Sequence, residues 1–411
     1  MNKLHTILQN QLVKIKPSKA EFFLIEKKAK NLCLKLKKAI KAKKIKAEIF
    51  IGGSLAKKTI LKKDKYDVDI FVRFNEEYKD KEISELLARI INKAGKATRI
   101  HGSRDYFQIK QNNIVFEIIP TIKVSNAKKA RNVTDLSYFH VDYVRKAVRK
   151  NEKIADDIML AKAFCYANNC YGAESYISGF SGYALELLII YYKSFLNFIK
   201  AVAKSNNQIV IDIKKWYKNK EGVLLNLNEA KLQSPLVFVD PTFKQRNALA
   251  ALSQGTFERF KGNCNKFLSK PNEKFFEKKK INEKNYNLII GAETNKQEGD
   301  IAGSKLLKFF RFFSSALEKN FIFYKKDFKY DEKKKALFYF KIKQKKELIF
   351  SGPLINKVEN VLAFKKKHKN CFIKNKQVFA IEKSKNIKQF LNEFKIRNKE
   401  VMGAMGIVEL G

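Results

Sequence analysis

The sequence contains few residues of several types, and each shortage excludes a class of protein. Its cysteines number five, with no Cys-x-x-Cys pair, so we expect free thiols in a reducing cytoplasm rather than disulfides or a zinc site. The longest apolar stretch, Leu187–Tyr192, is far too short to span a bilayer, and no apolar run of signal-peptide type opens the chain. Internal repeats and heptads are missing as well. These absences predict a cytoplasmic protein without a membrane segment.

Acidic residues are far fewer than basic residues in this sequence. Asp and Glu number 41 against 85 Lys and Arg, which leaves a formal charge of +44 on 411 residues. Such an excess favours a polyanionic partner, either nucleic acid or an anionic membrane surface. Because the basic residues are spread over the whole chain, we expect nucleic acid. The 45% of hydrophobic residues is enough to build the cores of two or three domains.

The stretch IFIGGSLAKKTILKKDKYDVDIFVRF, from Ile49 to Phe74, is typical of a phosphate-binding site. It predicts a strand, a Gly-Gly-Ser turn, a helix from about Leu55, a polar loop and a second strand. The two glycines allow the backbone to come close to a ligand. The hydroxyl of Ser54 would lie at the helix N-terminus, which attracts anions, and Lys57 adds positive charge.

Two aspartates follow on the second strand. Side chains alternate along a strand, so Asp67 and Asp69 point to the same face, about 6.5–7 Å apart at Cα. Their apolar neighbours predict a buried strand, where paired carboxylates need cations. A short acidic pair also arises by chance, and the alternative is a solvated edge strand. The order of phosphate-binding turn and carboxylate pair favours a nucleotidyl-transfer site.

A third carboxylate lies in another apolar strand. The sequence predicts a hairpin from Tyr106–Lys110 and Ile114–Val124, joined by an Asn-rich turn. In its second strand Glu117 stands among Val, Phe and Ile, where a charged side chain rarely stays unpaired. It either faces solvent, pairs with a lysine, or joins Asp67 and Asp69 from a neighbouring strand.

The chain becomes mostly helical after about Asn126. The helix that follows Gly182 is apolar on nearly all sides, which predicts the buried centre of a helical domain. Asp240 and the following proline are expected to lead into a helix that carries Arg246. The lysine-rich stretch Lys270–Lys284 is expected to be a linker.

The C-terminal part predicts elements in the order β-α-β-β-α-β, typical of a ferredoxin-like or RRM-like domain. That order includes a helix near Asn356–Lys367 and a hairpin at Phe372–Ile381. Three strand aromatics are candidates for base stacking, although such residues more often belong to a core: Phe338, Tyr339 and Phe340.

Four blocks carry a resemblance to a known family. They are the Gly-Ser to Asp67/Asp69 head, YGAESYISGFSGYALELLI (Tyr171–Ile189), DPTFKQRNALAALS (Asp240–Ser253) and, more weakly, GPLINKVENVLAFKKKH (Gly352–His368). The chain resembles archaeal-type (class I) CCA-adding enzymes, which are tRNA nucleotidyltransferases of the polymerase-β-like superfamily. The second block is long and specific.

The resemblance implies an α+β fold of several domains. A polymerase-β-like nucleotidyltransferase head would occupy residues 1–140, and a mostly helical neck that recognises the nucleotide would occupy 141–280. Residues 281–411 would form a tRNA-binding domain, ferredoxin-like or RRM-like, with a helical tail.

The resemblance also implies a metal site. The family's three metal-binding carboxylates fall on Asp67, Asp69 and Glu117. The third is usually Asp in the family, so Glu117 departs from the pattern by one methylene. Two Mg²⁺ ions held there would activate a 3′-hydroxyl for in-line attack on the α-phosphorus of CTP or ATP. Catalysis would then consist mostly of positioning and charge neutralisation, and no histidine need take part.

Six further residues match nucleotide-binding positions of the family. His140 matches a histidine near the sugar and triphosphate, and Arg246 an arginine that helps to read the base edge. The positions that hold the triphosphate match Ser54, Lys57, Lys162 and Tyr171. Lys57 stands where the family usually has Arg, so a bidentate fork becomes a point charge. The alternatives are a packed helix histidine for His140 and an ordinary helix surface for Lys162 and Tyr171.

The implied partner is tRNA, bound by its acceptor stem and elbow, and the implied reaction adds CCA to its 3′ end. A homodimer is compatible with the sequence. Two other interpretations remain: a poly(A)-type or oligoadenylate-type nucleotidyltransferase, and a non-catalytic basic RNA-binding protein on a decayed nucleotidyltransferase fold. The Tyr171–Ile189 block argues against the first, and the intact Asp67/Asp69 pair against the second.

Overall fold

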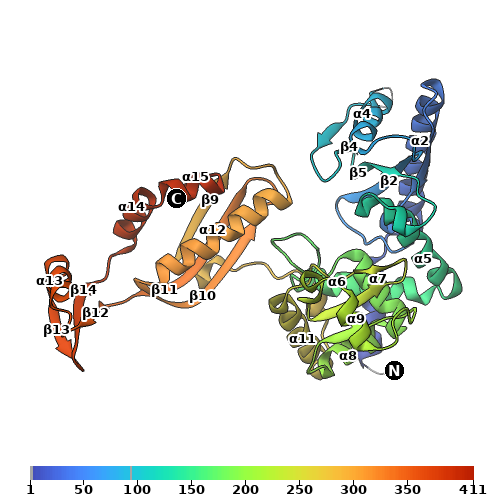
Figure 1. The fold of residues 1–411 in the computed structure, drawn as a ribbon. Coiled ribbons are helices and arrows are strands. Elements are labelled where there is room, and N and C mark those ends of the chain that lie inside the picture. The colour runs from blue at the N-terminus through green and yellow to red at the C-terminus, as the bar shows by residue number, and fades with distance from the viewer. Residues whose placement is uncertain (1–2, 93–94) are drawn as a thin grey trace. The chain divides into compact units, whose positions relative to one another are not determined.

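The protein is described by a computed structural model of residues 3–92 and 95–411. The chain divides into two compact units, Met1–Lys279 and Lys280–Gly411 (Figure 1). The first unit holds two large hydrophobic cores, one under the N-terminal sheet and one among helices. The three predicted domains, 1–140, 141–280 and 281–411, stay a prediction.

The N-terminal sheet has five strands in the order β1-β2-β5-β4-β3. In it β2 (Tyr66–Phe74) runs parallel to β5 (Ile114–Ile122), while the other neighbours are antiparallel. The remaining strands are β1 (Ala47–Ile51), β3 (Thr98–Ile100) and β4 (Tyr106–Gln111). The predicted hairpin is therefore present as β4 and β5.

Helices α2 (Lys19–Ala42) and α4 (Asp80–Ile91) share a core with this sheet and contact each other. A capping box between Ser18 and Glu21 begins α2. The even-numbered residues of β2, from Val68 to Phe74, are fully buried against these helices. Alternation leaves the two aspartates of β2 on the opposite face.

Helices with many phenylalanines build the second core. The ring of Phe260 lies 5.8 Å from that of Phe164 and 4.8 Å from that of Phe180. The helices of this core are α1 (Lys3–Ile15), α5 (Ser137–Lys150), α6 (Lys153–Ala167), α7 (Gly182–Tyr192), α8 (Phe195–Lys204) and α11 (Gln254–Ser269). The same unit contains α9 (Lys220–Asn226), α10 (Glu229–Leu232) and a sheet of β6 (Ile209–Ile211), β7 (Leu236–Asp240) and β8 (Phe243–Asn247).

One prediction for this unit is wrong, and a second, the linker at Lys270–Lys284, is confirmed only in that the boundary between the two units falls inside it. Arg246 lies on β8, not on a helix, because β8 folds back on β7 as a hairpin and the next helix begins only after its cap, Ser253. The stretch after Lys270 is also more than a linker. Phe275 packs against the second core, and Glu273 accepts hydrogen bonds from side chains of α1.

The second unit contains a four-stranded antiparallel sheet in the order β10-β11-β9-β15. Phenylalanines of α12 (Asp300–Glu318) pack on it. The strands are β9 (Leu288–Thr294), β10 (Phe321–Tyr330), β11 (Lys335–Gln344) and β15 (Ile407–Leu410). Between β11 and the last helices, α14 (Ile387–Arg397) and α15 (Lys399–Met405), the chain forms a second small sheet.

This small sheet corrects the predicted β-α-β-β-α-β assignment. It contains β12 (Glu347–Leu354), β13 (Cys371–Lys374) and β14 (Gln377–Lys383), in the order β12-β14-β13, and α13 (Val358–Lys367) contacts β12. The expected helix near Asn356 and the expected hairpin at Phe372 therefore belong to this sheet and not to the main one. Strand β15, which the sequence pattern did not reveal, completes the main sheet.

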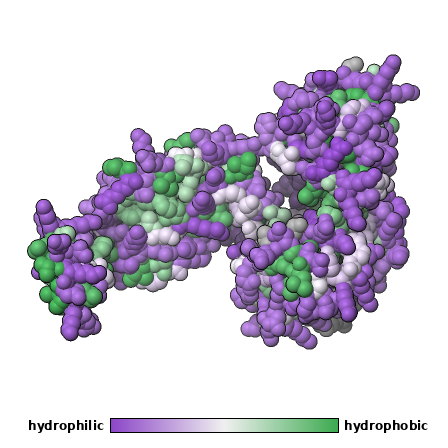
Figure 2. Space-filling model, in the orientation of Figure 1, coloured by the Kyte–Doolittle hydropathy of each residue, from purple (hydrophilic) through white to green (hydrophobic). Residues whose placement is uncertain are grey.

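The three aromatics considered for base stacking are core residues. Phe338, Tyr339 and Phe340 are fully buried, and the ring of Phe338 lies 5.1 Å from that of Phe310 on α12. Exposed hydrophobic side chains instead gather over the small sheet (Figure 2). In the described residues all five cysteines are free, as predicted, and no helix is long and apolar enough to cross a membrane.

Candidate active site

Adjacent strands bring the predicted carboxylates together. In the parallel pair β2 and β5, Asp69 is the register partner of Glu117, so both side chains point to the face that α2 and α4 leave uncovered. Asp67 lies two residues before Asp69 and shares that face. Gln108 of β4 donates a hydrogen bond from Nε2 to Oε1 of Glu117 at 2.9 Å. Of the described side chains, the partner of Glu117 is thus a glutamine and not a lysine.

The turn after β1 is shaped around Asp69. Gly53 has a φ of +56°, and a Cβ there would lie 1.6 Å from Oδ2 of Asp69. A Cβ on Gly52 would lie 2.3 Å from the ring of Phe71. The two glycines thus admit a carboxylate and a ring of the neighbouring strand. In the structure these two positions therefore require glycine because of neighbouring side chains, and not, as the sequence suggested, because a ligand must come close to the backbone.

The expected phosphate-binding helix is a single turn, α3 (Gly53–Ala56), which begins earlier than Leu55 and ends before Lys57. So short a helix has little dipole to offer an anion. Ser54 lies in this turn, and its backbone oxygen accepts a hydrogen bond from the backbone N–H of Thr59 at 2.9 Å.

The carboxylates have raised pKa values. Burial raises the pKa of Asp69; the cation of Lys57 opposes that rise, and the charge of Asp67 adds to it. Burial, followed by the charge of Asp69, raises the pKa of Glu117 to about 7. Asp67 is more exposed, and its Oδ2 lies 3.9 Å from Nζ of Lys63. The site therefore holds more negative charge than its present neighbours neutralise.

The lysines expected at the triphosphate meet on one buried carboxylate. Lys57 donates to Oε2 of Glu186 at 2.7 Å, and Lys162 donates to Oε1 at 2.8 Å. Lys162 also donates to Oγ1 of Thr59 at 2.9 Å. The hydroxyl of Tyr171 lies close by, because a Cβ on Gly182 would be 3.0 Å from it and 3.8 Å from Cε of Lys162. Lys162 and Tyr171 are thus not ordinary helix surface.

A second buried carboxylate organises His140 and Arg246. Arg246 donates to Oδ2 of Asp240 at 2.6 Å, and the hydroxyl of Tyr183 donates to Oδ1 at 3.0 Å. The ring of His140 stacks on Tyr183, with the centroids 4.0 Å apart. Its Nε2 lies 3.1 Å from Oδ2 of Asp240, yet forms no hydrogen bond within the described residues.

The electrostatic effects link these groups into one site. Burial lowers the pKa of His140, against the pull of Asp240, and the cation of Lys57 contributes to the lowering. Lys57 and Lys162 both act on Asp69. The charges of Glu186 and Asp69 both add to the rise that burial imposes on the pKa of Tyr171. The structure therefore brings the nine residues singled out in the sequence to neighbouring parts of one unit.

The comparisons with known proteins match this geometry. Residues 156–277 match the family "tRNA nucleotidyltransferase, second domain", and residues 2–137 match the "Second Messenger Oligonucleotide or Dinucleotide Synthetase domain". The CCA-adding enzyme of Nanoarchaeum equitans is 37% identical over 276 residues, which cover 66% of this chain and 68% of that protein. This chain belongs to the CCA-adding enzymes.

The alignments with other members of the family cover different shares of the two chains. The CCA-adding enzyme of Methanosarcina acetivorans is 32% identical over 64% of this chain and 56% of its own. The CCA-adding enzyme of Methanocaldococcus jannaschii is 28% identical over 92% of this chain and 87% of its own. Membership in this family implies nucleotide substrates and a divalent metal.

Solved structures show the same fold at low identity. The Cid1 poly(U) polymerase aligns with a TM-score of 0.54 at 15% identity, covering 68% of this chain and 99% of its own. A cytoplasmic RNA terminal U-transferase aligns with a TM-score of 0.53 at 14% identity, over 68% of this chain and all of its own. About two thirds of the chain therefore shares the nucleotidyltransferase fold of these proteins.

Sequence reasoning missed the partners of the predicted residues in this CCA-adding enzyme. Glu186 is the one charged residue of α7, which was a usable signal, because an isolated charge in a helix that is buried from Ala184 to Ile190 needs a partner. Asp240 and Tyr183 lie inside the blocks that resemble the family, but no sequence pattern there indicates that they contact Arg246 and His140. No local sequence pattern marked Gln108, because its contact with Glu117 depends on which strand lies beside β5.

The oxygen donors of Asp67, Asp69 and Glu117 suit a hard divalent cation such as Mg²⁺. The pKa values of Asp69 and Glu117 are raised by burial and by neighbouring carboxylates, and a bound cation would stabilise the charged forms of both. In the described ranges no three acidic, histidine or cysteine side chains lie close enough together to hold a metal ion. The residue types of Asp67, Asp69 and Glu117 and their shared face nevertheless fit a hard divalent cation.

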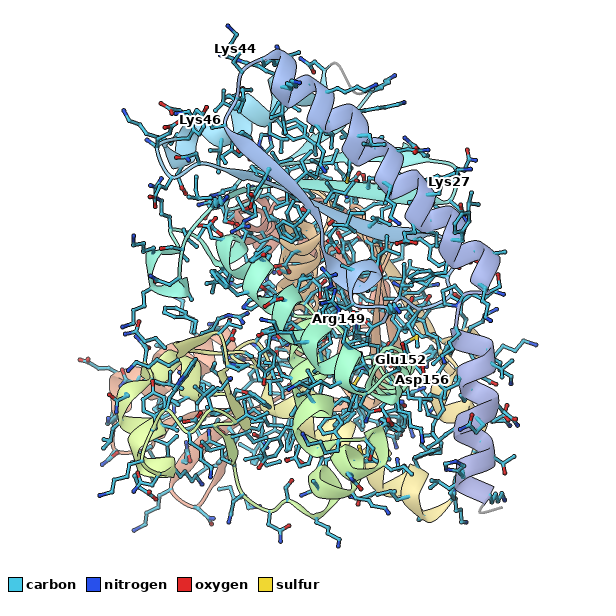
Figure 3. All side chains as sticks on the ribbon, turned by 90° about the vertical axis from the view of Figure 1, so that its right-hand side faces the viewer. Lys27, Lys44, Lys46, Arg149, Glu152 and Asp156 are labelled. Atoms are coloured by element: carbon cyan, nitrogen blue, oxygen red, sulfur yellow. The ribbon has the colours of Figure 1, made fainter. Side chains whose placement is uncertain are left out.

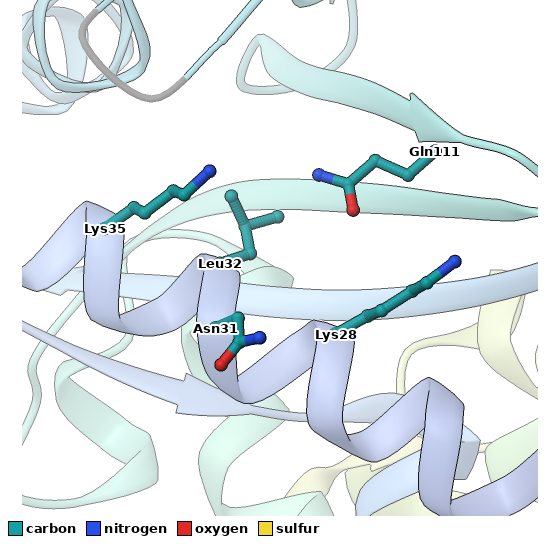
Figure 4. A pocket seen from close by; sticks show the side chains of 5 residues that line it. All are labelled: Lys28, Asn31, Leu32, Lys35 and Gln111. Atoms are coloured by element: carbon teal, nitrogen blue, oxygen red, sulfur yellow. The ribbon is translucent and has the colours of Figure 1, made fainter.

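One hollow of this unit lies elsewhere. It is lined by side chains of α2 and by Gln111 at the end of β4: Lys28, Asn31, Leu32, Lys35 and Gln111 (Figure 4). None of the nine predicted residues lines it, so it plays no part in the candidate active site.

Proposed function

We propose that this protein adds C, C and A to the 3′ end of tRNA from CTP and ATP, with Mg²⁺ and without a nucleic-acid template. The observation that carries the proposal is the register of Asp69 with Glu117 beside the cluster of Lys57, Lys162 and Glu186. This arrangement supports the proposal, because carboxylates suited to a metal and cations suited to a triphosphate lie in one unit of a CCA-adding family member. Two Mg²⁺ ions would be held by Asp67, Asp69 and Glu117.

The residues of the chain would then divide the work. The triphosphate would be bound by Lys57, Lys162 and the hydroxyl of Tyr171, which would also hold the departing pyrophosphate. Ser54 would lie at the edge of this triphosphate site. When bound, Mg²⁺ supplies the charge neutralisation that brings the 3′-hydroxyl and the α-phosphorus together. Most of the rate gain comes from positioning, so the reaction needs no protein nucleophile.

Base recognition would fall to the second cluster. Asp240 holds the guanidinium of Arg246 through one nitrogen at 2.6 Å, which leaves its other N–H donors for a base edge. His140 and Tyr183, stacked on each other, would lie near the sugar. A single reader of this kind suits an enzyme that accepts C and A in one pocket.

The tRNA would be held through its phosphates. Basic side chains project from the first unit, among them Lys27, Lys44 and Lys46 (Figure 3). We expect residues 281–411 to bind the acceptor stem and elbow by shape and backbone charge, because an A-form helix offers a wide, shallow minor groove. A homodimer stays a prediction.

The decisive experiment offers a tRNA that lacks its 3′ CCA, with Mg²⁺. We expect two C residues from CTP alone and a terminal A once ATP is present. Long homopolymer A tails would support a poly(A)-type enzyme instead, and no incorporation at all would support the non-catalytic alternative.

A further inference from the structure

Glu186 occupies a position where a carboxylate is costly. It is the one charged residue of α7, is itself fully buried, and its neighbours Leu185 and Leu187 are fully buried as well. Removing a carboxylate from water is expensive unless cations and hydrogen bonds compensate it. Its pKa is nevertheless lowered, because Lys162 and Lys57 outweigh the effect of burial. Glu186 is therefore an ionised carboxylate in the centre of the unit.

Each oxygen of this carboxylate holds one lysine from a different element. Oε2 accepts from Lys57, which follows α3, and Oε1 accepts from Lys162 of α6. Thr59 closes the group, since its Oγ1 accepts from Lys162 and lies 3.4 Å from Oε1. The two lysine side chains are almost as buried as Glu186, with 9% and 4% of their surfaces exposed.

The charges of this cluster are unequal. Two ammonium groups face one carboxylate, so the cluster itself carries one excess positive charge. An ammonium group has three N–H donors, and the contacts within the cluster use one from Lys57 and two from Lys162. Donors and charge are therefore left for an anion. Both lysines also act on Asp69, whose pKa they lower against the effect of burial.

We propose that Glu186 is a positioning residue for the triphosphate of the incoming nucleotide. It holds Lys57 and Lys162 next to each other, so that both cations face one polyphosphate. Without the carboxylate, two buried ammonium groups would repel each other and separate. The inference rests on the proposed function, in that the nucleotide is its ligand. The competing role is a purely structural one, in which Glu186 only ties the two cores of the unit together.

The test is a binding measurement on the full chain, by titration calorimetry without tRNA, with CTP, ATP and inorganic tripolyphosphate, each with Mg²⁺. In Glu186→Gln the amide keeps the size of the side chain but loses the charge and presents N–H to one lysine. We expect affinity for all three ligands to fall by the same factor, about 10- to 100-fold. In turnover assays the KM for CTP and ATP should rise by that factor, while the KM for tRNA changes less than about twofold.

A matched control separates positioning from stability. Asp135 and Arg104 form another buried ion pair of the same unit, with side-chain exposures of 0% and 2%, away from the candidate active site. Asp135→Asn should lower Tm at least as much as Glu186→Gln and leave tripolyphosphate affinity unchanged. If Glu186→Gln does not fold, Glu186→Asp decides, because its shorter reach must weaken tripolyphosphate binding while the charge is kept.

Two results would overturn the inference. One is wild-type affinity for tripolyphosphate in Glu186→Gln, or in Glu186→Asp where that variant has to decide. The other is full additivity, in which Glu186→Gln weakens binding just as much in a Lys57→Met/Lys162→Met background, where it has no lysines to place. Failure of the wild-type protein to add CCA would refute the proposed function instead, and the binding comparison does not depend on that assay.

Discussion

Asp69 on β2 and Glu117 on β5 are register partners across a parallel pair of strands, so their carboxylates share one face of the sheet. Oε1 of Glu117 also accepts a hydrogen bond from Gln108. That bond leaves the other carboxylate oxygen for a metal.

Substitutions of Glu117 test its metal role. Glu117→Ala should abolish nucleotide addition and leave Mg·CTP binding largely intact, because Asp67 and Asp69 hold the nucleotide-bound ion. Glu117→Asp keeps the carboxylate but shortens its reach by about one bond length, so a rate about 100-fold lower is expected. Single-turnover rates and Tm of both variants check this. A Glu117→Gln variant that is less stable but adds nucleotides within a few-fold of wild type would refute the metal role.

The raised pKa values predict how stability depends on pH when Mg²⁺ is removed. The pKa of Glu117 is about 7 in the folded protein, against an ordinary value of 4.5, so between these values the folded state binds more protons than the unfolded state. The free energy of unfolding should therefore fall as pH rises from about 4.5 to 7, and stay low above. Asp69, whose pKa is also raised, acts in the same direction.

Thermal melts in a chelator, at pH values from 5 to 8, measure this slope. Saturating Mg²⁺ should remove most of it, since the metal binds the charged carboxylates. Glu117→Gln should show a smaller slope than wild type. An equal slope in wild type and Glu117→Gln in the chelator would contradict the assignment, because other groups such as His140, whose pKa is lowered, contribute to both proteins alike.

Gly53→Ala tests the fit between the turn and the carboxylate. The new Cβ would clash with Oδ2 of Asp69 at a φ of +56°, so Asp69 must move and nucleotide addition should fall at least about 100-fold. Gly255→Ala on α11 is the matched control. A Cβ there meets nothing within 4 Å, so activity should be unchanged and stability slightly higher, by about 0.4–1 kcal/mol. Equal activity of the two variants would contradict the expectation.

Arg246 and Asp240 should act together on nucleotide choice. Arg246→Ala removes the base reader and should raise KM for CTP and ATP by about 10- to 100-fold, with more incorporation of UTP or GTP. Asp240→Asn should give a similar loss of discrimination, because it weakens the contact that holds the guanidinium. Competition assays with all four nucleotides measure both. The exposed neighbour Lys244→Ala serves as control, and a discrimination ratio at the wild-type value in Arg246→Ala would exclude the role.

Removal of Lys280–Gly411 tests the division of labour between the two units. The first unit has its own cores, so it should still bind Mg·CTP, while its KM for tRNA should rise far more than its KM for CTP. In the full chain tRNA affinity should fall steeply and log-linearly with salt. Equal affinity of the full chain for tRNA and for an unstructured RNA of the same length would contradict this prediction.

Local pattern was sufficient wherever the relevant residues are close in sequence. Alternation along β2 put Asp67 and Asp69 on one face, and Tyr171 and Arg246 lie in the blocks that resemble the family. Local pattern gave a wrong prediction where a segment can pair with a neighbouring strand instead of forming a helix. The residues after Asp240 have a helix-compatible composition, yet they form β8, because pairing with β7 satisfies their backbone.

The sequence by itself determined the residue types of the site, the basic charge and the family of this protein. The tertiary structure alone decided that Glu117 faces Asp69, that Gly53 must leave room for a carboxylate, and that Glu186 joins Lys57 to Lys162. Each of these depends on contacts between segments far apart in the chain; for Lys57 and Glu186 the separation is 129 residues. Strand register and buried ion pairing are properties of the assembled core, and a local sequence pattern carries no record of which segments will meet there.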